Sequence, residues 1–142
     1  MWKRNDLRCR HWSCALGRRD VHWLGHLKDP APVYAALDVL VLPTYREGLP
    51  QVLLEAAAME VPVVATRVTG CVDAVLDQTT VVLVPAREPE QLARAMVTLL
   101  DDPARRKTMG SLARERALRE FAIDPIARAT LHLYEELTAC PQ

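Results

Sequence analysis

The sequence predicts an α/β fold, a Rossmann-like parallel sheet with helices on both faces. Short runs of β-branched and other apolar residues alternate with longer segments of helical periodicity, and this alternation is typical of parallel βαβ units. The run Val39–Leu42 is apolar throughout, as expected of a strand buried on both faces. Open sheets of this kind bind ligands at the carboxyl ends of their strands, so the loops there are where a site is expected.

The elements follow from these patterns in order along the chain. Strands are expected at Val21–Leu24, Val39–Leu42, Val61–Thr66 and Val81–Val84. Helices are expected between them at Ala31–Leu37 and Pro50–Met59, with a single helical turn at Asp73–Leu76. Proline suits the first turn of a helix, because its missing N–H would have no partner there.

The last third of the chain is predicted to be helical. Each of its helices starts at or near a proline: Pro89–Leu100, Pro103–Glu120 and Pro125–Leu137. One face of the first carries Leu92, Met96, Leu99 and Leu100, and one face of the third carries Ile126, Ala129, Leu133 and Leu137. Because these faces are apolar, both helices are expected to pack on the sheet.

The composition is that of an ordinary soluble globular protein. With 142 residues, 50% hydrophobic and 25% charged, the chain has room for one domain with a core. The formal net charge of zero provides no field to attract nucleic acid, so no such partner is expected. There is no apolar run of membrane-spanning length and no signal peptide, so a cytoplasmic location is expected. The 4 cysteines lack the spacing of a disulfide framework and are interpreted as free thiols.

Two carboxylates flank one predicted helix start, in the segment EGLPQVLLE. Glu47 lies before the helix that opens at Pro50, and Glu55 lies just over one turn into it. The free N–H groups of a helix start favour a phosphate. Carboxylates accept hydrogen bonds from the vicinal hydroxyls of a ribose or hexose. The pattern therefore indicates a site for a sugar and a diphosphate together.

In this setting the chain resembles the retaining family 4 glycosyltransferases of GT-B fold. The resemblance runs from about Leu7 to Leu137 and is carried by residues 18–66, which follow that family's order of strand, helix, strand, Glu-x7-Glu helix and strand, and by the C-terminal helices of residues 102–137. It implies the C-terminal half of a GT-B enzyme, with a truncated N-terminal helical segment at residues 1–20 and the donor-binding domain at residues 21–142.

The resemblance also implies roles at the matching positions. Glu47 would act on the donor sugar as the catalytic carboxylate, and Glu55 would bind the ribose hydroxyls. The other implied donor-binding residues are Gly48, Leu49, Pro50, Gly25, His26 and Gly70. The implied reaction moves a hexose from a nucleotide-diphosphate sugar to a sugar or lipid-linked acceptor, with retention and without a metal or other cofactor. A separate N-terminal domain would supply the acceptor side.

The chain departs from the family pattern at several positions. The opening strand of the nucleotide domain, and the Arg and Lys that hold the diphosphate, would lie upstream of Met1. Glu60, Gln78 and Val81 replace glycines, and Asp73 replaces a glutamate. Glycine at such turns usually supplies a positive φ.

Other interpretations stay open. The chain could be a catalytically inactive module that binds a nucleotide sugar or docks on another domain. It could also belong to another GT-B enzyme, such as a sugar-nucleotide epimerase, that shares the fold. The two glutamates could be solvated helix-end carboxylates. A zinc site at Cys9, His11, Cys14 and His22 is disfavoured by their spacing. Basic residues between 105 and 119 leave contact with a membrane surface open, although interleaved acidic residues favour a solvated face.

Overall fold

The computed structural model describes residues 21–139. The chain divides into two compact units, residues 1–30 and residues 31–142, of which residues 21–30 and 31–139 are described. In the first unit, residues 21–30 form neither helix nor strand, so the strand predicted at Val21–Leu24 is wrong. A strand this short is stable only when it pairs with a neighbour, and within the described residues of its unit there is none. The predicted helical segment of residues 1–20 lies outside the described residues.

The second unit is built on a three-stranded parallel sheet in the order β1-β2-β3. Its strands are β1 (Leu40–Leu42), β2 (Val63–Thr66) and β3 (Val81–Val84). Leu40 is paired with Val63, and Val63 with Val81, so the strands are in register and end at the same edge of the sheet. The predicted parallel sheet is confirmed.

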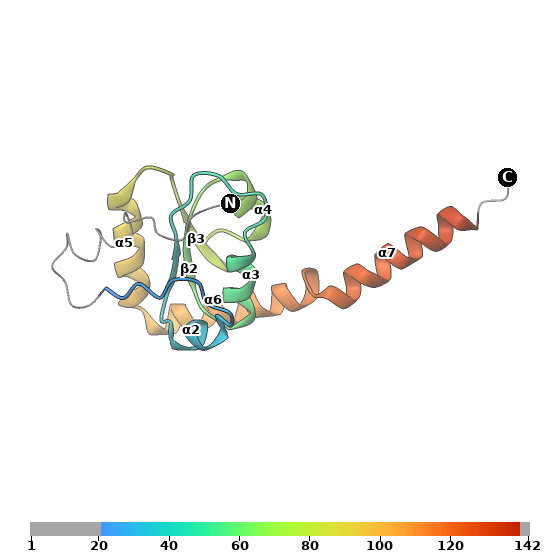
Figure 1. The fold of residues 1–142 in the computed structure, drawn as a ribbon. Coiled ribbons are helices and arrows are strands. Elements are labelled where there is room, and N and C mark those ends of the chain that lie inside the picture. The colour runs from blue at the N-terminus through green and yellow to red at the C-terminus, as the bar shows by residue number, and fades with distance from the viewer. Residues whose placement is uncertain (1–20, 140–142) are drawn as a thin grey trace. The chain divides into compact units, whose positions relative to one another are not determined.

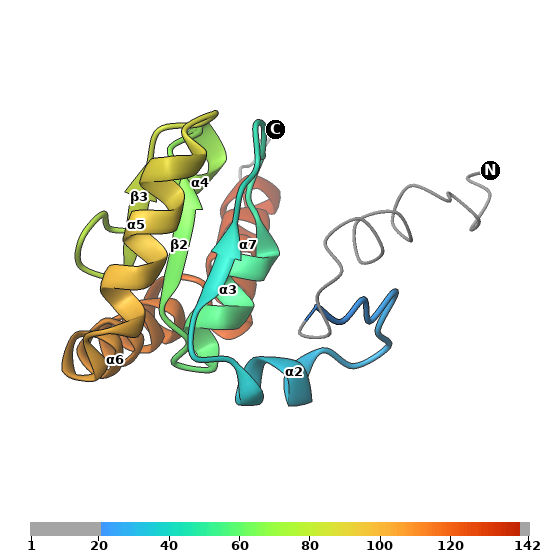
Figure 2. The same cartoon turned by 90° about the vertical axis from the view of Figure 1, so that its left-hand side faces the viewer.

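Helices lie on both faces of this sheet (Figures 1 and 2). They are α2 (Ala31–Ala36), α3 (Gln51–Ala58), α4 (Thr69–Ala74), α5 (Pro89–Leu100), α6 (Pro103–Glu120) and α7 (Ile123–Thr138). Figure 1 shows α5 on one side of the sheet and α3 and α4 on the other. The helical turn predicted at Asp73–Leu76 begins earlier, as α4, and it ends at Ala74, since beyond it the Leu76 N–H donates to the Thr80 hydroxyl at 2.9 Å instead of continuing the helix.

The core divides into two clusters according to the alternation of side chains along the strands. On one face, Val63 and Ala65 pack with Leu53 of α3 and Cys71 of α4. On the other face, Val64, Val82 and Val84 pack with Leu99 of α5 and Met109 of α6. Side chains alternate between faces in a strand, so a strand buried on both faces is expected to be apolar at every position. This holds for all of β3 and for β2 except its last residue, Thr66.

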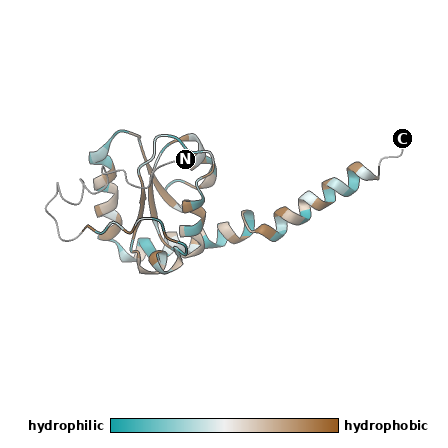
Figure 3. Ribbon diagram, viewed as in Figure 1, coloured by the Kyte–Doolittle hydropathy of each residue, from teal (hydrophilic) through white to brown (hydrophobic). Residues whose placement is uncertain are grey.

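The predicted packing of the two amphipathic helices is right for α5 and wrong for α7. Leu99 of α5 is fully buried, whereas α7 buries no residue, and its Leu133 and Leu137 are 54% and 67% exposed. The cause lies in α6, which at about 1.5 Å per residue leads the chain beyond the sheet before α7 begins. Figure 1 shows α7 extending away from the sheet, and the hydropathy colouring of Figure 3 shows hydrophobic residues along it.

Among residues 21–139, three non-glycine residues have positive φ: Glu60 (59°), Gln78 (61°) and Arg87 (66°). The first two occupy positions where glycine was expected, so the backbone conformation that glycine would supply is kept. Val81 was expected to occupy a third such turn, but it is an ordinary extended residue of β3.

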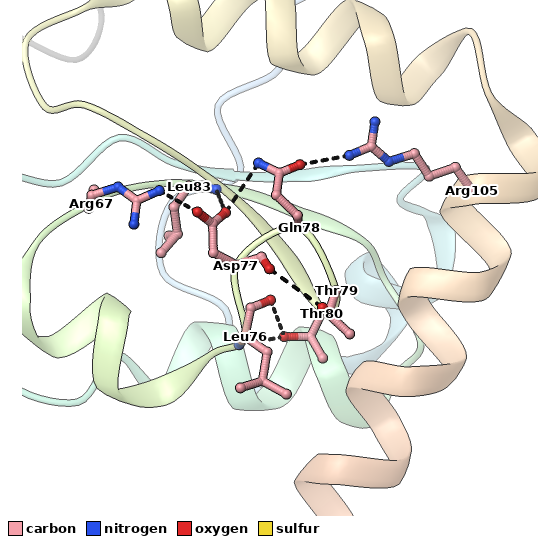
Figure 4. Close-up of polar contacts among 8 residues, drawn as sticks. All are labelled: Arg67, Leu76, Asp77, Gln78, Thr79, Thr80, Leu83 and Arg105. Carbon is pink, nitrogen blue, oxygen red and sulfur yellow. Dashed lines mark hydrogen bonds and ion pairs between the residues drawn. The ribbon is translucent and has the colours of Figure 1, made fainter.

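Side chains hold the turn between α4 and β3 (Figure 4). Asp77 accepts from the Leu83 N–H at 3.0 Å and forms an ion pair with Arg67, while Arg105 donates to Gln78 at 2.9 Å. Partial burial acts to raise the pKa of the Asp77 carboxyl, but the bonds from Leu83 and Arg67 outweigh it, and the pKa lies below the usual value. These contacts offset the strain at Gln78.

Candidate functional site

The loop that carries Glu47 is fixed to the carboxyl end of the sheet. Thr66, buried at the end of β2, donates its hydroxyl to the Thr44 carbonyl. The Thr44 hydroxyl stabilises the next turn of the loop, because it donates to the Arg46 carbonyl at 3.3 Å or accepts from the Arg46 N–H at 3.4 Å. The side chain of Glu47 is half-buried, and it makes no hydrogen bond or ion pair within the described residues. Its carboxylate is thus available to a ligand.

Gly70 of α4 packs closely against the backbone of this loop. A Cβ placed on Gly70 would lie 2.1 Å from the Gly48 carbonyl oxygen and 2.6 Å from the Glu47 carbonyl oxygen, which only a glycine avoids. Its neighbour Cys71 is fully buried, and burial, followed by the negative charge of Glu47, raises the pKa of its thiol. The structure therefore places α4 directly against the backbone of the Glu47 loop.

The start of α3 follows at once. Pro50 is buried and takes an extended conformation as the residue before the helix, so the helix begins one residue later than predicted, at Gln51. No side chain of the described residues caps this helix start, and the Leu53 N–H donates to the Pro50 carbonyl at 3.0 Å, so the N–H groups before Leu53 remain available to an anion. Gly48 and Leu49 are exposed beside it, and a Cβ on Gly48 would meet nothing within 4 Å.

Glu55 lies on α3 and has a partner that the sequence did not reveal. The Tyr34 hydroxyl of α2 donates to Oε2 of Glu55 at 2.7 Å. The Tyr34 ring is 7% exposed, whereas Glu55 is exposed to solvent. Burial, the bond to Glu55 and the charge of Glu55 together raise the pKa of Tyr34 to about 12. The only signal in the sequence was a tyrosine at an apolar-facing position of a short helix.

The structure thus brings Glu47, Gly48, Leu49, Pro50 and Gly70 together at one edge of the sheet, with Glu55 on the helix that follows. Gly25 and His26 belong to the first unit and are described there alone. Gly25 has a positive φ of 67°, and both residues are exposed. Their roles in donor binding stay a prediction.

A hollow that no sequence pattern predicted lies on the α5 side of the same sheet edge. It has a volume of about 340 Å³, and Tyr45, Thr66, Arg87 and Leu92 line it among others. The Arg87 guanidinium lies over the Tyr45 ring at 5.8 Å. Neither Glu47 nor Glu55 lines this hollow, so it is separate from the carboxylates.

No cluster of three or more potential metal ligands occurs in residues 21–139. Of the disfavoured zinc ligands, Cys9, His11 and Cys14 lie outside those residues, and His22 is exposed. Among the same residues, no helix is both long and apolar enough to span a membrane.

An open parallel α/β sheet, with carboxylates and an uncapped helix start at its carboxyl edge, defines a Rossmann-like ligand-binding domain. The chain belongs to the group 1 glycosyl transferases, whose family model matches residues 3–102. It is 37% identical over 97 residues to the capsular polysaccharide biosynthesis glycosyltransferase CapM of Staphylococcus aureus, covering 68% of this chain and 26% of CapM. It is 44% identical over 109 residues to a D-inositol 3-phosphate glycosyltransferase of Kineococcus radiotolerans, covering 71% and 25%.

Solved structures agree with this assignment. A sucrose-phosphate synthase of Thermosynechococcus elongatus superposes with a TM-score of 0.86 at 33% identity, over 93% of this chain and 34% of that one. Anabaena HepE in complex with UDP-glucose superposes with a TM-score of 0.80 at 25% identity, over 94% and 36%. The predicted fold, the C-terminal half of a GT-B glycosyltransferase, is confirmed. The chain spans about a quarter of the length of these curated relatives.

Proposed function

We propose that this chain provides the donor site of a retaining glycosyltransferase that transfers a hexosyl unit from a nucleotide-diphosphate sugar to a sugar or lipid-linked acceptor. The observation that carries the proposal is the placement of Glu47 and Glu55 around the uncapped start of α3, at the carboxyl edge of the sheet. Glu55 accepts hydrogen bonds from the ribose, the α3 N–H groups face the diphosphate, and Glu47 contacts the hexose.

The reaction needs positioning more than a protein nucleophile. The bond between the hexose C1 and the diphosphate oxygen breaks, and the acceptor oxygen forms the new bond on the same face. The acceptor proton passes to the leaving phosphate. Glu47 orients the hexose, the α3 N–H groups stabilise charge on the departing diphosphate, and the proposed reaction uses no metal. An N-terminal GT-B domain brings the acceptor.

Calorimetric titration with UDP and GDP sugars tests this proposal without an acceptor. Glu55→Ala removes hydrogen bonds to a charged group, each worth about 1.5–3 kcal/mol, so the Kd of the sugar that binds should rise by about tenfold or more. Glu90→Ala is the matched control, because Glu90 is an exposed glutamate on α5 that pairs with Arg94 of the same helix. Absence of binding, or equal effects of both variants, would contradict the proposal.

A second candidate is a docking module without activity of its own. The bare apolar face of α7 favours it, because such a face needs a partner surface. Glycosyl transfer upon addition of a separately produced N-terminal GT-B domain would support the enzyme. Complex formation without transfer would favour the docking module.

A further inference from the structure

Tyr34 and Glu55 come from helices that are separated along the chain by β1. The tyrosine ring is packed in the core cluster with Leu53 and Ala56 of α3, and its hydroxyl emerges beside Glu55. The bond of 2.7 Å from this hydroxyl to Oε2 crosses 21 positions of sequence. A buried ring therefore carries a donor to an exposed carboxylate.

The consequence of this bond lies in the carboxylate. A glutamate on a helix surface samples several rotamers, and fixing it on binding a ligand costs conformational entropy. The Tyr34 ring cannot move without disrupting the core, so its hydroxyl anchors one carboxylate oxygen. The other oxygen, Oε1, keeps its full capacity to accept hydrogen bonds.

We propose that Tyr34 is a positioning residue for Glu55, which it holds in the orientation that accepts hydrogen bonds from the ribose, and that it thereby sets the preference for ribonucleotides over deoxyribonucleotides. The inference rests on the proposed function and extends it to a residue outside the donor-binding segment. The raised pKa of Tyr34 supports it, because burial and Glu55 keep the hydroxyl protonated, and so able to donate, well above neutral pH.

The test compares Tyr34→Phe with the unaltered chain. The variant keeps the buried ring and removes only the donor. Calorimetry would give the Kd for UDP and for UDP lacking its 2′ or its 3′ hydroxyl. We expect the unaltered chain to prefer UDP by about tenfold over at least one analogue. Tyr34→Phe should reduce that preference to about threefold or less. Tyr134→Phe, at an exposed tyrosine of α7, is the matched control and should leave the preference unchanged.

The preference separates positioning from a general loss of stability, which would weaken binding of all three nucleotides equally. An unchanged preference in Tyr34→Phe, together with its loss in Glu55→Ala, would overturn the inference and leave the proposed function intact. Retention of the preference in Glu55→Ala would instead overturn the proposed function.

A second measurement tests the contact itself. The losses in Tm of Tyr34→Phe and Glu55→Ala should not add in the double variant, because the second change removes a bond that is already broken. Additive losses would show that the two side chains do not interact, and would overturn the inference whatever the nucleotide data show.

Discussion

Replacing Gly70 by alanine should damage the site through the backbone of its loop. The added Cβ would lie 2.1 Å from the Gly48 carbonyl oxygen, where ordinary contacts begin at 3.4 Å, so the loop must move by roughly 1 Å. Neighbouring atoms belong to backbone rather than to a flexible side chain, so little can yield without moving Glu47. We expect a loss of about 1–3 kcal/mol in the free energy of unfolding, as for other overpacked positions.

The effect on ligand binding should be larger than the stability loss alone explains. Displacing a positioning group by about 1 Å can cost up to about a hundredfold in function. We expect the affinity for the nucleotide sugar to fall by about tenfold or more in Gly70→Ala, at a temperature where the variant remains folded. Thermal unfolding followed by circular dichroism, and calorimetric titration of the same samples, measure both quantities.

Two other glycines provide the controls. Gly48→Ala adds its methyl group where nothing lies within 4 Å and should leave the free energy of unfolding unchanged. Gly110→Ala places a Cβ 2.1 Å from the Glu60 carbonyl oxygen, in the contact between α6 and the end of α3, and should lower stability without weakening binding in the folded fraction. Wild-type stability in Gly70→Ala, or equal loss of affinity in Gly110→Ala, would refute the reasoning.

Three further predictions concern stability. Glu60→Gly should raise the free energy of unfolding by about 1 kcal/mol, because glycine adopts the φ of 59° without strain; urea unfolding measures this, and a decrease would contradict it. Leu99→Ala should lower the free energy of unfolding by about 2–5 kcal/mol, measured by chemical denaturation, because Leu99 is fully buried. Leu133→Ala should lower it by less than about 0.5 kcal/mol, because Leu133 is exposed on α7. Equal losses would show that this face of α7 is buried. The pKa of Tyr34 is raised from 10.0 to about 12 in the folded chain, so the stability that its protonated hydroxyl contributes is complete below pH 10 and is lost as the pH rises toward 12. Urea unfolding across this pH range should therefore show a weaker pH dependence of the free energy of unfolding in Tyr34→Phe. An identical pH dependence would contradict the shift.

The sequence was sufficient where burial imposes a pattern. β2 and β3 are buried at every residue, so their apolar runs identify them without ambiguity. Local patterns also placed Glu47 in the loop after a strand and Glu55 in the helix that follows, since Pro50 marks the boundary. These features are local, and each depends on residues that are close in sequence.

It failed where the outcome depends on distant contacts. Val21–Leu24 has a strand composition but no partner strand among residues 21–30 of its unit. The face of α7 has the right periodicity, but none of its residues is buried by the described part of the chain. The strand predicted at Val81–Val84 is confirmed as β3, but Val81 was also matched to a turn glycine, and its pairing with Val63 shows that it is extended. The bond of Tyr34 to Glu55 was invisible for the same reason, because only the folded chain brings α2 against α3.

The charges at the site indicate what the donor half needs from elsewhere. A diphosphate would lie near Glu47 and Glu55, and the α3 start offers only about half a unit of positive charge in compensation. Arg67, at the same edge of the sheet, is already paired with Asp77, and Arg87 lies over Tyr45 in the separate hollow. Two carboxylates repel the diphosphate more than one helix start attracts it, and Arg46, which is exposed and precedes Glu47 in the same loop, offsets only one of these charges. Donor affinity should therefore increase with further cations at this edge. We expect this increase when the Arg and Lys that the family resemblance assigns to the diphosphate are supplied with the nucleotide domain, even before an acceptor is present.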